Sequence, residues 1–146
     1  MHVTKRADYA MRAMAYLASE PSGSFVLAGT VALNMSVPAV FLSKIMKQMV
    51  EAGLVRSRSG PGGGYGLARP PNKITFREVL EAVEGPVQMV PCQSDSGEQC
   101  VIHQHCSQLH VWDAIRLRIA DVLEEYTLDS VRTRGRGSSS EVVMLS

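Results

Sequence analysis

The sequence predicts a mainly α-helical chain that carries one small β hairpin. Apolar residues recur at steps of three and four along several segments, which is the spacing of one helix face. A glycine-rich stretch also separates two short runs of strand-forming residues, a pattern typical of a hairpin. The chain has 146 residues, of which 45% are hydrophobic and 20% charged. This composition supports a folded core and excludes disordered and collagen-like classes.

The first predicted helix covers residues 5–19, where the apolar residues form one face, and Pro-Ser-Gly at 21–23 ends it. A short helical stretch follows at 27–33, and a turn at 34–37 leads to Pro38, a residue suited to the first turn of a new helix.

The helix that starts at Pro38 is predicted to run to about Ala52 and to stop at Gly53, an expected position for a left-handed cap. Its spacing predicts one buried and one exposed face. The residues expected to be buried are Phe41, Leu42, Ile45, Met46 and Met49, and those expected to be exposed are Ser43, Lys44, Lys47 and Gln48.

Two short strands are predicted at 54–58 and 65–68, around the turn at 59–64. Three helices followed by such a hairpin is the element order of a winged helix-turn-helix, in which the helix at 38–52 would enter the major groove. The glycines do not match a phosphate-binding P-loop, which needs Gly-Lys-Ser/Thr at the start of a helix. They suit a wing tip that approaches the DNA backbone, although an ordinary tight turn is an alternative.

The second half of the chain is predicted to begin with a helix at 75–83, capped by Thr75 and Glu78. A polar loop with cysteines follows, and then a long helix at 106–126. One apolar stripe on this helix is expected to meet a partner, and it consists of Leu109, Trp112, Ile115, Ile119, Val122 and Tyr126. The expected organisation is a DNA-binding domain at 1–84, a cysteine-bearing loop at 85–106, a dimerisation helix at 107–130 and a mobile tail at 131–146.

Charge is distributed unevenly between the two halves. Residues 1–77 carry ten Lys/Arg and three Asp/Glu, whereas residues 78–146 carry five and eleven, so the halves have net charges of +7 and −6. A basic half indicates a polyanionic partner, most often nucleic acid. Ser43, Lys44 and Lys47 are therefore candidates for contacts with base edges and phosphates in the major groove, and Arg58, Gly62 and Gly63 for contacts from the wing; an ordinary solvated face is the alternative.

Three cysteines, Cys92, Cys100 and Cys106, have the spacing C-x7-C-x5-C. An iron-sulfur cluster suits three thiolates in a loop. Structural zinc sites usually include a closer cysteine pair, but zinc with His103, His105 or His110 as fourth ligand stays an alternative. A thiol-based redox sensor and inert buried cysteines are further alternatives.

Several other classes of protein are disfavoured. The longest uncharged run, residues 21–43, is interrupted by polar residues and Pro38, so no membrane span is expected. The N-terminus lacks the features of a signal peptide, which predicts a cytoplasmic protein. No convincing catalytic set is present, since the one enzyme-like pairing is Cys106 with His103 or His110. We therefore expect neither an enzyme nor a small-molecule substrate.

Four segments and the three cysteines resemble a known family. The segments are 4–12 (Thr-Lys-Arg-Ala-Asp-Tyr-Ala-Met-Arg), Val37-Pro38 with 41–45 (Phe-Leu-Ser-Lys-Ile), 53–55 (Gly-Leu-Val), and above all Gly60-Pro61-Gly62-Gly63-Gly64-Tyr65. Through them, residues 1 to about 130 resemble the winged-helix iron-sulfur transcription regulators of the IscR, NsrR and RirA type.

The resemblance implies a homodimer that binds a palindromic operator in double-stranded DNA, with the long helix at the dimer interface. It also implies a 2Fe-2S or 4Fe-4S cluster held by Cys92, Cys100 and Cys106. The family's fourth ligand varies, and the best match is Asp8 of the partner subunit, with His110 as second choice. The gap between the first two cysteines is two residues longer than the commonest family spacing. The resulting C-x7-C-x5-C pattern most resembles the iron-responsive type.

The sequence therefore predicts a cytoplasmic, homodimeric repressor whose operator affinity depends on a cluster that senses iron status, nitric oxide or redox state. The alternatives are a zinc- or thiol-based regulator and a non-DNA iron-sulfur or redox carrier whose basic half docks on an acidic protein.

Overall fold

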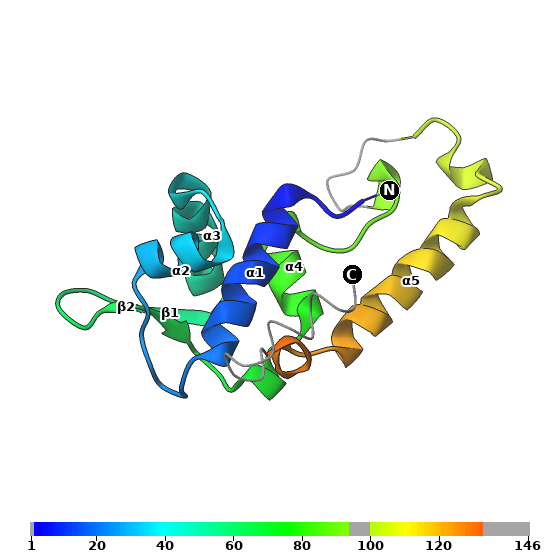
Figure 1. Cartoon of the computed structure of the whole chain (residues 1–146). Coiled ribbons are helices and arrows are strands. Elements are labelled where there is room, and N and C mark those ends of the chain that lie inside the picture. The colour runs from blue at the N-terminus through cyan, green and yellow to red at the C-terminus, as the bar shows by residue number, and fades with distance from the viewer. Residues whose placement is uncertain (1, 94–99, 133–146) are drawn as a thin grey trace, which may run out of the picture.

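The computed structural model describes residues 2–93 and 100–132, and it confirms a mainly helical chain with a small two-stranded sheet (Figure 1). The elements are α1 (Lys5–Ser19), α2 (Ala28–Met35), α3 (Ala39–Glu51), β1 (Val55–Arg58), β2 (Gly64–Leu67), α4 (Phe76–Glu84) and α5 (Leu109–Glu125), with short 3-10 turns η1 (Pro71–Lys73), η2 (Pro91–Gln93), η3 (His103–His105) and η4 (Leu128–Val131).

Helix α1 is the central element, in contact with α2, α3 and α4. It begins where the Thr4 hydroxyl accepts a hydrogen bond from the Ala7 amide at 3.1 Å, a typical N-cap. Ala10 and Ala13 are fully buried, and their small side chains let the neighbouring helices approach closely. Met14 on the same face is also fully buried, so α1 forms the middle of the core.

Helices α2 and α3 form the helix-turn-helix. Helix α2 extends to Met35, and Ser36 in the left-handed region (φ 53°) ends it, so the turn starts later than predicted. Pro38 is the N-cap residue of α3 and not its first helical residue. Leu42, Ile45, Met46 and Met49 are buried, as predicted.

The prediction that Phe41 is buried was wrong, because its side chain is 49% exposed. The core-facing stripe of α3 consists of Leu42, Ile45, Met46 and Met49, and Phe41 lies to one side of it. Its ring instead packs edge-on against Tyr9 of α1, with ring centroids 5.8 Å apart. This contact joins the start of α3 to α1 at the surface of the domain.

No single helix within residues 2–93 and 100–132 is long and apolar enough to cross a membrane. Helices α2 and α3 together have the length and apolar composition of a membrane span, but the pair is bent by 118° at the turn between them. The apolar face of α3 lies in the core described above.

The wing is an antiparallel hairpin in which Val55 pairs with Leu67 and Arg58 with Gly64. Val26, in the loop before α2, pairs with Tyr65 through two backbone hydrogen bonds of 2.8 Å. The wing is therefore tied along one edge to the helix-turn-helix. A side chain at Gly64 (φ 133°) would collide with the Val26 carbonyl, so this close approach requires glycine.

The predicted cap of α4 is confirmed as a reciprocal pair. The Thr75 hydroxyl accepts from the Glu78 amide at 3.1 Å, and the Glu78 carboxylate accepts from the Thr75 amide at 3.0 Å and from Arg69 at 2.8 Å. Partial burial acts to raise the pKa of Glu78, but the hydrogen bonds from Thr75 and Arg69, with the charge of Arg69, outweigh it and lower the pKa.

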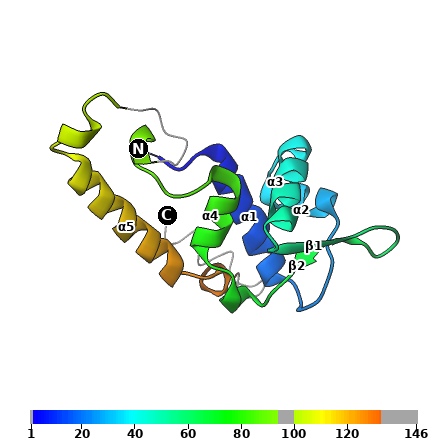
Figure 2. The same ribbon diagram turned by 180° about the vertical axis from the view of Figure 1, so that it is seen from behind.

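Helix α5 packs on α4, and its start lies at the end of the molecule opposite the wing (Figures 1 and 2). It begins at Leu109, later than predicted, because Cys106 ends the 3-10 turn η3. Of the α5 residues, all within the described part of the chain, Ala120 alone is buried.

After α5 the chain returns to the winged-helix domain formed by α1–α4 and the hairpin. The Phe76 amide donates to the Tyr126 carbonyl at 2.9 Å, and the Leu128 amide donates to the Ile74 carbonyl at 3.0 Å. Leu128 is fully buried, and Val131 packs against the core. Leu128 and Val131 thus pack in that core, whereas the sequence placed Leu128 in the dimerisation helix and Val131 in the mobile tail. Residues 133–146 of the predicted tail lie outside the described residues.

We expect Glu78→Gln to lower the free energy of unfolding at neutral pH by about 0.5–1 kcal/mol, the scale of a partly exposed ion pair at a helix N-terminus. Because folding lowers the pKa of Glu78, its contribution is present above its ordinary pKa and is lost as pH falls through the lowered value. The difference between wild type and variant should therefore shrink in acid, as measured by urea unfolding across pH. Glu125→Gln, at the exposed end of α5, is the control. A difference that is constant with pH would contradict the prediction.

Candidate nucleic-acid interface and cysteine pocket

The outer face of α3 carries the residues that the sequence selected for the major groove. Ser43, Lys44 and Lys47 are all exposed and lie opposite the buried stripe. The Ser43 hydroxyl donates to the Ala39 carbonyl at 3.1 Å, which leaves its oxygen able to accept another hydrogen bond. Gln48, expected to be exposed, is half-buried, and among the described residues its side-chain oxygen has no hydrogen-bond partner.

The two arginines of the wing share one aromatic neighbour. The Arg58 guanidinium lies 4.4 Å from the centroid of the Phe25 ring, and that of Arg56 lies 5.7 Å from the same ring. Arg58 also donates to the Gly62 carbonyl at 3.0 Å. Phe25 therefore holds both positive charges along the wing, so that less conformational entropy is lost when they bind an anion.

The wing tip depends on its glycines in two ways. Gly62 is exposed with φ 73°, a conformation that favours glycine. Gly63 is buried within the wing, where a Cβ would collide with the Arg58 carbonyl and lie 2.8 Å from the Gly60 carbonyl oxygen. Of the two glycines that the sequence selected for DNA contact, Gly62 is thus on the surface, and Gly63 shapes the turn.

The three cysteines line one pocket of about 340 Å³. Cys92 belongs to η2, Cys100 comes from the loop before η3, and Cys106 follows η3. The first turns of α5 supply Leu109 and Trp112 to the wall. The remaining lining residues are Val90, Pro91, Ile102 and Gln108. Segments that are separate in sequence thus bring their thiols to a largely apolar pocket at the start of α5.

Two glutamines form hydrogen bonds that connect the segments around this pocket. The Gln93 carbonyl oxygen accepts from the amides of Met89 and Val90, and its amide donates to Asp113 of α5 at 2.8 Å. The Trp112 indole donates to Gln108 at 2.8 Å. The segment that carries Cys92 is therefore attached to α5 without a metal. Among the residues that the structure describes, no three His, Cys, Asp or Glu side chains converge as they would around a single metal ion.

Asp8 and His110 lie elsewhere in the same chain. Asp8, in the first turn of α1, pairs with Arg12 at 2.8 Å and is half exposed. His110 is exposed in the first turn of α5. Neither is among the described residues that line the cysteine pocket, so within one protomer the pocket offers the three thiols as ligands.

Arg12 connects Asp8 to the helix-turn-helix. Its guanidinium donates to the carbonyl of Met35, the last residue of α2, at 3.3 Å. It also lies 5.5 Å from the centroid of the Tyr9 ring, and Tyr9 in turn packs against Phe41 of α3. Asp8 is therefore connected, through Arg12 and Tyr9, to both helices of the helix-turn-helix.

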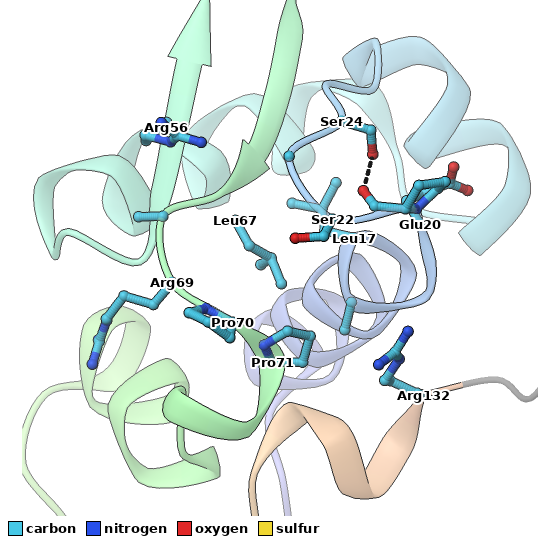
Figure 3. Close-up of a pocket in the computed structure, with 14 residues that line it drawn as sticks. Leu17, Glu20, Ser22, Ser24, Arg56, Leu67, Arg69, Pro70, Pro71 and Arg132 are labelled. Atoms are coloured by element: carbon cyan, nitrogen blue, oxygen red, sulfur yellow. Dashed lines mark hydrogen bonds between the residues drawn. The ribbon is translucent and has the colours of Figure 1, made fainter.

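Figure 3 shows a second pocket, of about 210 Å³, between the end of α1, the base of the wing and the segment after η4. The three arginines among its described lining residues are engaged elsewhere. Arg56 lies over the Phe25 ring, Arg69 bonds to the Lys73 carbonyl and to Glu78, and Arg132 pairs with Asp129 at 3.3 Å. The Ser24 hydroxyl donates to the Pro21 carbonyl at 2.6 Å. The polar groups do not converge on the hollow, which makes it a weaker candidate than the cysteine pocket.

Sequence reasoning missed Phe25, Arg12 and the role of Trp112 in the pocket wall. The sequence placed Trp112 on the apolar stripe of the long helix, and the structure has it in α5. The sequence did not indicate that it lies beside the three cysteines. Nothing in the local sequence marks Phe25 as a partner of Arg56 and Arg58. The spacing of Asp8 and Arg12 by four was a visible signal, because such pairs lie on one helix face.

Curated relatives cover most of this chain. It is 36% identical over 131 residues to a protein of Mycobacterium tuberculosis named as a candidate HTH-type transcriptional regulator, covering 90% of this chain and 81% of that protein. It is 30% identical over 128 residues to the HTH-type transcriptional regulator NsrR of Bacillus subtilis, covering 88% of each.

Solved structures agree with the fold. CymR, the global cysteine regulator of B. subtilis, superposes with a TM-score of 0.73 at 23% identity, covering 88% of this chain and 94% of that one. At this identity the similarity supports the fold alone. IscR of T. potens superposes with a TM-score of 0.71 at 25% identity, covering 88% of this chain and 84% of that one.

We expect Gly63→Ala to weaken binding of this protein to its DNA site by about tenfold, the scale of one lost charge-assisted hydrogen bond, because the turn that presents Arg58 must shift. Thermal unfolding should change little, since the wing tip is remote from the core. Gly29→Ala is the matched control, because the added methyl group meets nothing within 4 Å. Fluorescence anisotropy with labelled duplex checks both. Equal affinities for the two variants would show that the wing tip does not contribute.

The family assignment rests on nearly the whole described chain. A family model described as an iron-dependent transcriptional regulator matches residues 3–134, which include the helix-turn-helix, the wing, the three cysteines and α5. DNA binding and control of transcription follow from this match and from the named relatives. The chain belongs to the Rrf2 family of transcriptional regulators.

Proposed function

We propose that this protein is a cytoplasmic, homodimeric repressor whose affinity for a palindromic operator is controlled by an iron-sulfur cluster. The proposed ligands are Cys92, Cys100 and Cys106 with Asp8 of the partner subunit, and the cluster is of the 2Fe-2S or 4Fe-4S type. The observation that carries the proposal is the convergence of the three thiols on one pocket beside α5.

The donor set fits a cluster better than a single ion. Thiolates are soft ligands that favour iron-sulfur clusters, copper(I) and zinc. The thiols surround a shared pocket but do not converge on one point, and a cluster with several irons suits ligands that are spread in this way. When bound, a cluster would supply a centre that responds to iron supply and to oxidants. The apolar residues Val90, Ile102 and Leu109 line the same pocket and would border the cluster.

Dimerisation is supported by the surface of α5. Val111 and Val122 are each about half exposed and lie on the same side of α5, a helix that packs on its own domain mainly through α4. A second copy of the same helix would cover such a face in a two-fold arrangement. Two recognition helices related by that axis match a palindrome, which is the basis for proposing an operator of this type.

Arg12 supports a route from the cluster site to DNA. Asp8 can serve the partner's pocket only if it leaves Arg12, with which it is paired in this structure. Arg12 would then lose its counter-charge while it keeps its contacts to the Met35 carbonyl and the Tyr9 ring. Because these groups contact the turn before α3 and Phe41, the position of α3 would respond to the ligation state of Asp8.

A thiol switch is the second candidate, and the exposure of Cys100 favours it. An accessible thiol can be oxidised or modified without any metal. The same fold occurs in CymR, named as a cysteine regulator.

We expect the wild-type protein, purified without oxygen, to contain stoichiometric iron and sulfide and to show quenched tryptophan emission. Trp112 is the single tryptophan and lines the cysteine pocket, so its emission reports occupancy. Cys100→Ala should lose the visible chromophore, the quenching and the cluster-dependent change in operator affinity. Ser107→Ala, an exposed neighbour of Cys106, should retain all three.

A Cys100→Ala variant with normal iron, sulfide and operator response would show that the ligand assignment is wrong. A wild-type protein that stays colourless after anaerobic reconstitution would contradict the cluster. Operator affinity that then changes on thiol oxidation alone would support the thiol switch.

We expect Asp8→Asn to assemble a cluster on the three thiols but to lose its iron to a chelator about tenfold faster, which is the low end of the effect of disturbing a metal site's supporting ligands. Operator affinity should then differ less between the cluster-bound and cluster-free forms. Asp129→Asn, which also removes an acid paired with an arginine, is the control. Iron loss is followed by absorbance and operator binding by anisotropy. Wild-type behaviour of Asp8→Asn in both assays would remove Asp8 from the ligand set.

A further inference from the structure

Val40 is an apolar side chain in an unexpected place. It is the second residue of α3 and is 69% exposed, although α3 buries Leu42 and Ile45 completely and Val50 in part. Residues three, four and seven positions later on a helix share its face. For Val40 these are Ser43, Lys44 and Lys47, the exposed residues of the proposed DNA-binding face. Val40 is thus the first-turn member of that face.

The character of this face changes along α3. It begins with Ala39 and Val40, continues with the two lysines, and ends at the exposed acid Glu51. The neighbouring Phe41 ring is held at the side by Tyr9, so it does not cover Val40. Phosphates repel Glu51 and attract the lysines. The first turn of α3 is therefore the part that approaches the bases most closely, as is usual for a recognition helix.

An exposed isopropyl group selects one chemical feature of the major groove. The edges of adenine, guanine and cytosine present hydrogen-bond donors and acceptors there, whereas thymine also presents its 5-methyl group. Val40 cannot form hydrogen bonds, and contact with a polar edge would desolvate that edge without compensation. Contact with a methyl group removes apolar surface of both partners from water.

We infer that Val40 recognises a thymine methyl group in each half-site of the operator and so selects thymine at that position. The inference rests on the DNA-binding function, and it is independent of what occupies the cysteine pocket. It assigns base selection at one position to an apolar contact, alongside the polar and charged contacts proposed for Ser43, Lys44 and Lys47.

The test combines a protein variant with a DNA variant. The operator is first selected from random duplexes with the full-length dimer, and each thymine of one half-site is then replaced in turn by deoxyuridine, which removes only the methyl group. At one position, wild-type affinity should fall by about fourfold, the factor expected for one buried methyl group. Val40→Ala removes the contact from both half-sites, so it should bind the unmodified operator about sixteenfold more weakly, the square of that factor, and be insensitive to deoxyuridine at that position.

The matched control is Leu33→Ala, which removes an aliphatic side chain that is 83% exposed on α2, outside the α3 face. It should keep the full sensitivity to deoxyuridine. Circular dichroism and the salt dependence of affinity should be the same for Val40→Ala and wild type, because neither folding nor phosphate contacts change.

An operator bound equally well with thymine and deoxyuridine at every position would overturn the inference. So would a Val40→Ala variant that keeps the wild-type sensitivity. If selection enriches no sequence at all, the operator-binding function itself fails, which is a different result from an operator that is bound but indifferent to thymine methyl groups.

Discussion

The structure depends on the return of the chain from α5 into the DNA-binding domain. Backbone hydrogen bonds join Tyr126 and Leu128 to Phe76 and Ile74, and Leu128 is fully buried between these segments. Burial of a leucine side chain contributes roughly 1.5–3 kcal/mol. Without this anchor, α5 would be held mainly by its packing on α4. With it, the long helix and the helix-turn-helix are parts of one framework, and a partner bound to α5 also positions the recognition helix.

Anchoring one end of α5 gives its other end a specific role. The start of the helix lies far from the wing and forms a wall of the cysteine pocket through Leu109 and Trp112. Gln93, next to Cys92, is bonded to Asp113 in the second turn. Chemistry at the thiols therefore acts on a helix whose far end is fixed in the domain that binds DNA. This arrangement serves a cluster and a thiol switch equally well, since both act by changing how the thiol-bearing segments are held.

Helix α1 provides the second connection between the halves. Its inner face is made of small and flexible residues, Ala10, Ala13 and Met14, which pack in the core. Its outer face carries Asp8 and Arg12, whose pairing leads to Met35 and Tyr9. The same helix thus supports the core and carries the charged contacts nearest the turn of the DNA-binding motif. Arg12 contacts Asp8, the Met35 carbonyl and the Tyr9 ring at the same time. The i,i+4 spacing in the sequence indicates only the first of these partners.

Local signals in the sequence determined the fold class, the helix-turn-helix, the wing and the capping box of α4. Helical periodicity, a proline before α3 and a glycine-rich turn depend on neighbouring residues, and these are present in the chain itself. The exposed face of α3 also followed from spacing, so Ser43, Lys44 and Lys47 lie where they were expected. Tertiary structure alone decided the rest. Phe41 lies at the surface, where its ring packs against Tyr9 of α1. Phe25, in the loop before α2, contacts the guanidinium groups of Arg56 and Arg58 on the neighbouring strand. The thiols share a pocket because the segment that carries Cys92 packs against the start of α5, a contact between distant segments that local spacing does not encode.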